Sequence, residues 1–517
     1  MAEDRQWDVL VIGGGINGVG IARDLVGRGL SVLLCEQDDL GNHTSSASSK
    51  LIHGGLRYLE YYEFRLVAKA LAEREVVLRA APHIVRPLRF VMPHVPTLRP
   101  AWMIRIGLLL YDHLDMGKRK LLPGSEGVDL RNHPAGAPLV PELTKGFMYS
   151  DAWVDDARLV VLNAMDVAGR GVDIRTRTRC VSARRDGDQW RATLRSTIDG
   201  SESPVRARCL VNASGPWVSA FLDDAVRLKR HLNIRQVKGS HIVVPKLFDH
   251  EYAYIFQNTD KRIVFAIPYE HEYTLIGTTD LDYDDDPAVV EITEDETRYL
   301  CDLANRFFRN KITADDIVWS YSGVRPLVDD DADDVSAVTR DYLLDLDTDG
   351  APILSVFGGK ITTFRKLAEE VVDKLTPVLG IDKPAWTSSH APLPGGDIDN
   401  ADFDGFLAEF RQAHAWLPSD LAERYAHAYG TLAAELVGDA GGLADLGEDL
   451  GGGLYGAEVD YLVRREWART AEDILWRRSK LGLHVSAGTV GRLEARLSGD
   501  RGVSGVSGVS AARASSS

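Results

Sequence analysis

The sequence contains few cysteines and no pattern that would use them together. Among 517 residues there are only four, and they are Cys35, Cys180, Cys209 and Cys301. None of them forms a CxxC pair, which argues against a zinc site or a disulfide framework and suits a reducing compartment. Motifs for haem or iron–sulfur clusters are also missing. We therefore expect no metal centre.

Long apolar runs and an excess of basic residues are absent too. No uninterrupted apolar run reaches the ~20 residues that a membrane-spanning helix needs. The opening stretch MAEDRQWDVLVIGGG leaves no room for a signal peptide, because a strand is expected from about Trp7. A net charge of −16 disfavours a general nucleic-acid partner. We expect a protein on the cytoplasmic side that binds anionic ligands through local basic groups.

The composition is that of a globular protein with more than one core. Hydrophobic residues make up 44% and charged residues 26% of the chain, which are ordinary globular values. Because 517 residues are too many for one ordinary core, we expect two or three domains.

Residues 7–40 have the pattern of a dinucleotide-binding unit. A short apolar run precedes Gly13, Gly15 and Gly18, a helical pattern follows to Arg28, and a second apolar run ends at Glu36. The first glycine permits a tight turn, the second lets backbone approach a pyrophosphate, and the third lets the helix pack on the strand. The acidic side chain is placed to accept hydrogen bonds from ribose hydroxyls. A glycine-rich turn with only a packing role is the alternative.

The next stretch, TSSASSKLIHGGLRYLE, distinguishes this unit from a typical NAD domain. It is rich in small hydroxyl residues over 44–49, and a pair of glycines follows at 54–55. Hydroxyl groups can hydrogen-bond a cofactor's phosphates and ring edge, and glycines let backbone approach a flat ring system. On composition alone, a plain surface linker is equally compatible with residues 45–49.

Several stretches of the chain occur together in one known family. They are VIGGGINGVGIARDLVGRGL, TSSASSKLIHGGLRYLEYYEFRLV, RPAWMIRIGLLLYDHL, YSDAWVDDARLV, LVNASGPWV, KGSHIVVP, RIVFAIPY, IGTTD, YSGVRPL and SVFGGKITTFRKLAE, in family order over about residues 7–370. A further matching stretch covers residues 445–483. With these motifs the chain resembles the FAD-dependent, membrane-associated sn-glycerol-3-phosphate dehydrogenases, which belong to the glycine-oxidase and D-amino-acid-oxidase fold group.

The resemblance implies an α/β fold, α+β overall, with a discontinuous FAD-binding Rossmann-like domain. We assign residues 1–80, 150–230 and 340–385 to that domain, and 81–149 and 231–339 to an antiparallel-sheet substrate domain. A Pro/Gly/Ser-rich linker at 386–400 precedes a helical cap domain over 396–496, which is a candidate for subunit contacts in a homodimer. The small, polar residues 497–517 are expected to be disordered.

The resemblance also implies FAD as the cofactor and places the site residues. The strand end at 210–218 lies near the flavin, and the Gly-Gly turn at 358–359 lies by its pyrimidine end. On their own, these stretches also read as a core strand and an ordinary strand-to-helix turn. The predicted cofactor-binding residues are Gly13, Gly15, Gly18, Glu36, Thr44, Ser45, Ser46, Ser49, Lys50, Leu51, His53, Gly54, Gly55, Ala213, Gly215, Trp217, Gly358, Gly359, Lys360, Ile361 and Thr362.

The implied reaction is the oxidation of sn-glycerol 3-phosphate to dihydroxyacetone phosphate (EC 1.1.5.3), with hydride transfer from C2 to flavin N5. Cationic side chains are the physical candidates for the phosphate, and the resemblance assigns this role to Arg57, Lys360 and Tyr58. It places Arg325 near the reacting hydroxyl. Because an arginine is a poor base, we assign it electrostatic stabilisation. A surface salt bridge is the alternative for any one arginine.

The proton acceptor is expected to be a histidine, whose ordinary pKa lies near neutral pH. The resemblance puts His241 at the flavin face, so we predict it to be the base, with His53 as the second candidate. Thr278 is placed to orient the substrate hydroxyl. A buried histidine with a purely structural role is the alternative for His241.

Residues 99–120 predict a helix that lies in a membrane interface. Its side chains are apolar over most of the circumference, Arg105 and Asp112 share one stripe, and basic residues lie at both ends, with Lys118, Arg119 and Lys120 at the second. A buried helix of the substrate domain is the alternative. The family's peripheral attachment favours the membrane, where a quinone, ubiquinone or menaquinone, would accept the electrons. An oxygen-using glycerol-3-phosphate oxidase is the alternative function, and no insertion typical of such oxidases is evident.

Overall fold

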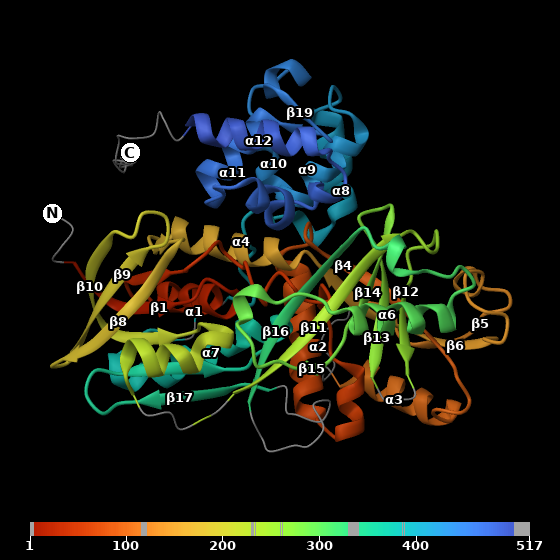
Figure 1. Ribbon diagram of the computed structural model, residues 1–517, viewed down its shortest axis with the longest axis horizontal. Helices are drawn as coiled ribbons and strands as arrows, with labels where there is room; N and C mark the ends of the chain where they lie inside the picture. Colours follow the sequence, from red (N-terminus) through yellow and green to blue (C-terminus); the bar gives the residue numbers. More distant parts are fainter. Residues whose placement is uncertain are drawn as a thin grey trace.

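The structure is a computed structural model of the chain. It describes residues 5–114, 121–228, 232, 234–258, 260, 262–328, 341–384, 386 and 388–500. The predicted basic cluster at 118–120 and residues 501–517 of the predicted tail lie outside this set. Figure 1 shows two sheet-containing regions side by side and a helical region, in blue, stacked on them.

The first sheet has eight strands in the described residues, with the central order β17-β18-β10-β1-β2-β7. The central strands β18, β10, β1, β2 and β7 run parallel, and β17 pairs with β18 in antiparallel fashion. Strand β9 pairs antiparallel with β10, and β8 pairs antiparallel with β9. The bounds are β1 (Gln6–Ile12), β2 (Val32–Cys35), β7 (Asp173–Arg175), β8 (Thr178–Asp186), β9 (Gln189–Ser196), β10 (Glu202–Asn212), β17 (Leu343–Asp347) and β18 (Ile353–Phe357).

Strand β1 is apolar at successive positions because both faces of the sheet are covered. Val9 and Val11 belong to the buried cluster that contains side chains of α1, α4 and α7, whereas Leu10 and Ile12 belong to a second cluster on the other face. Three helices lie against the first face: α1 (Ile16–Gly27), α4 (Asp156–Gly169) and α7 (Phe364–Leu379). On the other face, α5 (Val218–Ala220) leads into a π-helical turn, η4 (Phe221–Val226).

The second sheet has ten strands in the described residues, in the order β15-β11-β14-β13-β12-β4-β6-β3, with β16 on β11 and β5 on β6. It is almost entirely antiparallel; only β12 and β4 pair in parallel. The bounds are β3 (Leu51–Ile52), β4 (Val85–Pro93), β5 (Glu126–Asp129), β6 (Lys145–Val154), β11 (Ile234–Pro245), β12 (Ala253–Gln257), β13 (Ile263–Tyr269), β14 (Tyr273–Gly277), β15 (Leu281–Asp282) and β16 (Trp319–Val328).

Helices cover both faces of the second sheet. Side chains of α6 (Glu294–Phe307) pack on one face, and side chains of α2 (Phe64–Ala80) and α3 (Ala101–His113) pack on the other. The predicted boundary at 149/150 falls inside β6, and β3 pairs with β6 although its residues were assigned to the FAD domain. The second sheet therefore begins earlier in the chain than the sequence indicated.

The carboxy-terminal region is helical apart from one two-stranded ribbon. It consists of α8 (Phe403–Ala413), α9 (Ser419–Tyr429), α10 (Ala433–Val437), β19 (Asp449–Gly451), β20 (Leu454–Tyr455), α11 (Gly456–Glu466), the turn η11 (Asp473–Arg478) and α12 (Ala487–Asp500). It contacts both other regions. Arg158 of α4 forms a buried ion pair with Glu466, and the ring of Trp476 stacks on Trp319 of β16 with centroids 4.4 Å apart.

Helix α3 begins at Ala101, one residue after Pro100. Leu108 and Tyr111 are buried beneath it, and Arg105 and Asp112 hydrogen-bond to Ser125. Most of the other apolar side chains of the helix are exposed, whereas Ile104 is half-buried, so α3 is not the fully buried helix that was the alternative. The large apolar side chains of α3 and the adjacent segment 61–64 that are exposed are Tyr61, Tyr62, Phe64, Trp102, Met103, Ile106, Leu109 and Leu110.

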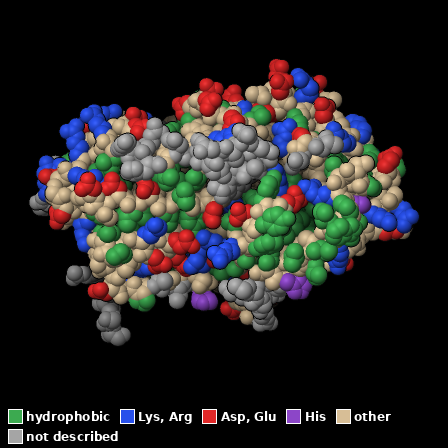
Figure 2. All heavy atoms as spheres, turned by 90° about the horizontal axis from the view of Figure 1, so that it is seen from below, with side chains coloured by type: hydrophobic (Ala, Val, Ile, Leu, Met, Phe, Trp, Pro, Cys, Tyr) green, Lys and Arg blue, Asp and Glu red, His purple; other side chains and the backbone are tan. Residues whose placement is uncertain are grey.

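We call these eight residues the apolar patch. In Figure 2, which views the molecule from the side where α3 lies in Figure 1, hydrophobic side chains gather on this face. Within the described ranges, no helix combines the length and apolar character needed to cross a membrane.

Candidate active site

A cavity of about 780 Å³ runs between the two sheets. It is lined by residues from the ends of β1, β2, β10 and β18 in the first sheet and by residues of β11 and β16 in the second. Most of the predicted site residues lie on its wall. They are Gly13, Gly15, Glu36, Thr44, Ser45, Ser49, Leu51, His53, Tyr58, Ala213, Gly215, Trp217, His241, Thr278, Arg325, Gly358, Gly359, Lys360, Ile361 and Thr362.

The nucleotide end of the cavity is built from the turn between β1 and α1. Gly13 adopts a positive φ of 109°, and a Cβ there would lie 2.5 Å from the carbonyl oxygen of Ala213. A Cβ on Gly18 would lie 1.9 Å from the carbonyl oxygen of Gly13, so this glycine serves helix packing and not the cavity wall. The N–H of Ile16 donates to the Ser45 hydroxyl at 3.0 Å, which ties the serine loop to the start of α1.

Glu36 lies at the end of β2 with its carboxylate anchored. One oxygen accepts from the N–H of Gly14 at 2.6 Å and the other from the N–H of Asp38 at 2.9 Å. Burial raises the pKa of Glu36, and these two N–H donors partly offset that effect. Each oxygen retains a second lone pair, so the carboxylate can still accept from a ribose hydroxyl.

Five further predicted residues do not line the cavity. Lys50 is fully buried and forms an ion pair with Asp156, 2.7 Å from Nζ to oxygen. The Gly54 N–H donates to the Tyr111 hydroxyl, and a Cβ on Gly55 would collide with the Tyr58 ring. Ser46 donates to the carbonyl of His43. Arg57 donates to the Tyr61 hydroxyl at 3.2 Å. Ligand contacts of these residues remain predictions.

His241 faces the cavity from β11 and is 3% exposed. Its Nε2 lies 2.9 Å from the Ser49 hydroxyl, and its ring stacks on Tyr321 with centroids 4.7 Å apart. The Nδ1 atom is buried without a hydrogen-bond partner among the described residues. Burial lowers the pKa of His241 well below its ordinary value, and the positive charges of Arg325 and Lys50 lower it further. The imidazole is therefore neutral and able to accept a proton.

Arg325 lies on β16, next to β11, and forms an ion pair with Asp280. Its second amino group donates to the Thr278 hydroxyl and to the carbonyl of Thr279, each at 3.0 Å. Thr278 directly follows β14, the other neighbour of β11. Three adjacent strands thus bring an imidazole, a guanidinium and a hydroxyl to one end of the cavity.

The turn after β18 supplies another part of the cavity wall. Gly358 and Gly359 both have positive φ, and Lys360 follows them before α7. The Lys360 ammonium lies 3.8 Å from the centroid of the Tyr58 ring. These two predicted phosphate ligands are therefore neighbours on the cavity wall.

Two glycines that the sequence did not single out shape the cluster of His241, Thr278 and Arg325. A Cβ on Gly239 would lie 1.8 Å from an amino group of Arg325, and one on Gly277 would lie 2.1 Å from the His241 ring. Both glycines occur within quoted motifs, KGSHIVVP and IGTTD. Only the register of β11 against β14 and β16 shows why a side chain is excluded there.

The buried carboxylate of Glu296, which contacts residues adjacent to His241 and Thr278, was also not predicted from the sequence. Glu296, at the start of α6, accepts from the hydroxyls of Ser240 and Thr279 at 2.8 and 2.7 Å and pairs with Lys238 at 2.7 Å. Burial raises the pKa of Glu296, but Lys238 and the hydroxyl donors outweigh it and lower the value overall. This carboxylate fixes the residues adjacent to His241 and Thr278.

The cavity fits FAD by its chemistry. Gly13 and Gly15 line the cavity at the start of α1, where the backbone N–H groups of a first helical turn and the helix dipole favour a pyrophosphate. Glu36 supplies a carboxylate for a ribose, and the Gly358–Gly359 turn precedes a second helix start. Within the described residues no group of histidine, cysteine, aspartate and glutamate side chains has a metal-binding arrangement.

Comparison with known proteins first gives the class of protein. A family described as "FAD dependent oxidoreductase" matches residues 8–365, and one described as "C-terminal domain of alpha-glycerophosphate oxidase" matches residues 386–493. A solved structure of the glycerol-3-phosphate dehydrogenase from Bacillus halodurans, complexed with FAD, superposes with a TM-score of 0.76 at 26% identity, over 96% of this chain and 95% of that one. The predicted FAD-binding fold and cofactor are confirmed.

Relatives of similar length then show which family of FAD-dependent oxidoreductases the chain belongs to. A glycerol-3-phosphate dehydrogenase of Pseudomonas aeruginosa is 58% identical over 482 residues, 93% of each chain. A D-erythritol 1-phosphate dehydrogenase of Brucella abortus is 53% identical over 490 residues, 94% of this chain and 96% of that one. The chain belongs to the FAD-dependent glycerol-3-phosphate dehydrogenase family.

Proposed function

We propose that this protein oxidises sn-glycerol 3-phosphate to dihydroxyacetone phosphate. The observation that carries the proposal is that His241, Thr278 and Arg325 line the same FAD-fitting cavity as Lys360 and Tyr58. Cationic groups suit a phosphate, and a neutral imidazole beside a guanidinium suits a hydroxyl that must lose its proton. FAD, when bound, would supply the acceptor for the hydride that leaves C2 of the substrate.

In this proposal the phosphate is held by Lys360 with Tyr58, and Arg57 contributes from the adjacent turn. The Lys360 ammonium lies over the Tyr58 ring. A cation–π interaction with the negative face of that ring stabilises its position. A fixed phosphate holds C2 of the substrate in the position needed for oxidation. Such orientation raises the reaction rate because part of the entropic cost of reaching the transition state is met on binding.

His241 accepts the proton of the C2 hydroxyl. Its lowered pKa keeps the ring neutral, and its hydrogen bond to Ser49 and stacking on Tyr321 fix the ring plane. Arg325 stabilises the negative charge that develops on the oxygen, while Asp280 holds the guanidinium in place. Thr278 orients the hydroxyl group through the same guanidinium.

We further propose that a membrane quinone takes the electrons and that the apolar patch attaches the protein to the inner face of the cell membrane. The exposed Trp102 and Leu109 side chains, 65% and 53% accessible, suit the interfacial zone of a bilayer. A quinone dissolved in that bilayer would be reached without a soluble carrier. Oxygen as the acceptor is the alternative.

A second substrate is favoured by one observation. The 53% identical relative from Brucella abortus is named for D-erythritol 1-phosphate, which is a longer polyol phosphate. The phosphate-binding residues and the base would serve both substrates. The space around the carbon chain of the substrate would therefore decide which of the two is preferred.

One assay distinguishes these possibilities. The purified holoenzyme is given either polyol phosphate, with either a soluble quinone analogue or dissolved oxygen as the acceptor. The proposal predicts the highest kcat/KM with glycerol 3-phosphate and the quinone analogue. Faster turnover of erythritol 1-phosphate would make that compound the preferred substrate. Hydrogen peroxide formation at a rate comparable to quinone reduction would make oxygen the acceptor.

A further inference from the structure

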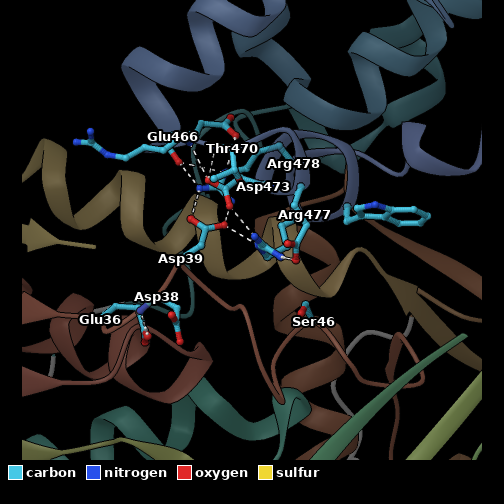
Figure 3. Close-up of polar contacts among 12 residues, drawn as sticks. Glu36, Asp38, Asp39, Ser46, Glu466, Thr470, Asp473, Arg477 and Arg478 are labelled. Carbon is cyan, nitrogen blue, oxygen red and sulfur yellow. Dashed lines mark hydrogen bonds and ion pairs between the residues drawn. The ribbon is translucent and has the colours of Figure 1, made fainter. Parts of the chain in front are cut away.

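The cavity wall near its nucleotide end is interrupted at residues 38–40. Glu36 and Gln37 line the cavity, and so do Gly41 to Ser45, but Asp39 between them does not. Asp39 is only 2% exposed. Its carboxylate points toward Arg477 and Arg478 of the carboxy-terminal region, as Figure 3 shows.

Two consecutive arginines of the carboxy-terminal turn η11 hold this carboxylate. Arg478 binds both oxygens of Asp39, at 2.6 and 2.8 Å, and Arg477 donates through Nε at 2.7 Å. The three residues are almost wholly buried, at 0% exposure for Arg478 and 7% for Arg477. A forked pair of this kind fixes orientation as well as distance.

The arginines are themselves fixed in place. Arg478 also donates to the carbonyl of Glu466, and Arg477 donates to Asp473 at 2.6 Å. Asp473 accepts in addition from Arg177, which precedes β8. Burial raises the pKa of Asp473, but Arg177 and the other donors outweigh it and lower the pKa to about 2. The network therefore ties the carboxy-terminal region to the first sheet through charged groups (Figure 3).

On the other side, the segment that carries Asp39 is tied to the glycine turn. Glu36, three residues before it, accepts from the N–H of Gly14, and Gly41, two residues after it, donates to the carbonyl of Gly14 at 3.1 Å. Gly13 and Gly15 line the cavity on either side of Gly14. A shift of Asp39 would consequently move both the ribose carboxylate and the wall beside the pyrophosphate.

We propose that Arg477 and Arg478 are positioning residues for FAD. By holding Asp39 from behind the cavity wall, they keep residues 36–45 in the conformation that binds the adenosine end of the cofactor. The carboxy-terminal region thus sets FAD affinity without contacting the cofactor. This inference rests on FAD binding alone and is independent of the substrate assignment.

The test measures the FAD dissociation constant by titrating apoprotein and following the quenching of flavin fluorescence. Arg478→Gln and Asp39→Asn should each raise the dissociation constant about tenfold, since they break the same buried network. The double variant should bind no more weakly than the weaker single variant. Arg478→Lys, which keeps the charge, should recover part of the affinity.

Arg424→Gln is the matched control. Arg424 makes a forked pair with the buried Glu458, at 2.6 and 2.7 Å, inside the carboxy-terminal region and away from Asp39. It should lower the melting temperature of the apoprotein to a similar extent while leaving the FAD dissociation constant within about twofold of wild type. At saturating FAD, the KM for substrate should be unchanged in Arg478→Gln.

Three results would overturn the inference. They are wild-type FAD affinity in Arg478→Gln, an equal loss of affinity in Arg424→Gln, and additive losses in the double variant. If an apoprotein variant does not fold, the rate of FAD release after dilution of the holoenzyme replaces the titration, and Arg477→Gln replaces Arg478→Gln. The same comparison with Arg424→Gln then decides.

Discussion

At the scale of single residues, the proposed chemistry depends on a neutral His241. Its burial and the nearby charges of Arg325 and Lys50 disfavour the imidazolium form. His241→Asn should therefore slow reduction of the bound flavin by substrate by about 10²–10⁴-fold. Stopped-flow absorbance at the flavin band measures this rate. FAD content should stay at the wild-type level, and a near-normal rate would remove His241 as the base.

The space left by Gly239 gives a second prediction. A Cβ there would force Arg325 away from Thr278, and loss of one stabilising donor costs roughly 100-fold in rate. Gly239→Ala should slow flavin reduction to about that extent. Gly127→Ala is the control, because a Cβ at Gly127 would meet nothing within 4 Å. Equal rates for the two variants would contradict the role given to Arg325.

Most of the residues predicted from the sequence line one cavity, but the sequence did not indicate how they contact one another. Ser49 was predicted to bind FAD, and the structure shows it hydrogen-bonded to His241. The partner of Arg325, Asp280, lies 45 positions earlier in the chain. Such pairs depend on strand register, which a single sequence does not specify across long connections.

At the scale of elements, α3 carries the clearest test. Replacing Leu109, which is 53% exposed, by glutamate should weaken binding to anionic phospholipid vesicles about tenfold or more, because a charge opposes burial in the interface. Co-sedimentation with vesicles measures the binding.

Ile198→Glu is the control for α3, since Ile198 is 63% exposed and lies outside the apolar patch. It should bind vesicles as wild type does. Equal binding by the Leu109 variant would show that the patch serves another purpose.

Elements with strong local signals were predictable from the sequence. The apolar run before Gly13 and the helical pattern after Gly15 became β1 and α1 with nearly the expected bounds. By contrast, the two-residue strand β3 joins the second sheet through a pairing with β6, about 100 residues later. Its short length gives no periodic signal, so the sequence did not indicate that these residues would pair with β6.

At the scale of the whole molecule, stability should depend on pH through His83. This residue follows α2, is 2% exposed, and neither ring nitrogen has a hydrogen-bond partner among the described residues. Burial first, then the charge of Arg158, lowers its pKa from 6.5 to about 3. Because the unfolded chain binds the proton more tightly, this stability is present above pH 6.5 and is lost as pH falls toward 3.

The loss should be about 1.4 kcal/mol per pH unit below the unfolded-state value. His83→Leu should therefore flatten the decrease in melting temperature between about pH 7.5 and 5.5. The same substitution at the exposed His390 should not change the slope. Identical slopes for all three proteins would show that His83 becomes protonated without unfolding.

The assembly of the regions was the least predictable level. The sequence indicated a helical carboxy-terminal region but not that η11 would contact both sheets, through Arg478 to Asp39 and through Trp476 to Trp319. These pairs join positions 439 and 157 residues apart. Isolated arginines and tryptophans in a helical pattern carry no signal for such partners.

The most direct test of the central claim is the visible spectrum of the purified holoenzyme without oxygen, before and after addition of sn-glycerol 3-phosphate. The account predicts that the flavin band is present and bleaches on addition of substrate, before any acceptor is supplied. A flavin band that persists at saturating glycerol 3-phosphate would mean that His241, Arg325 and Lys360 serve another molecule.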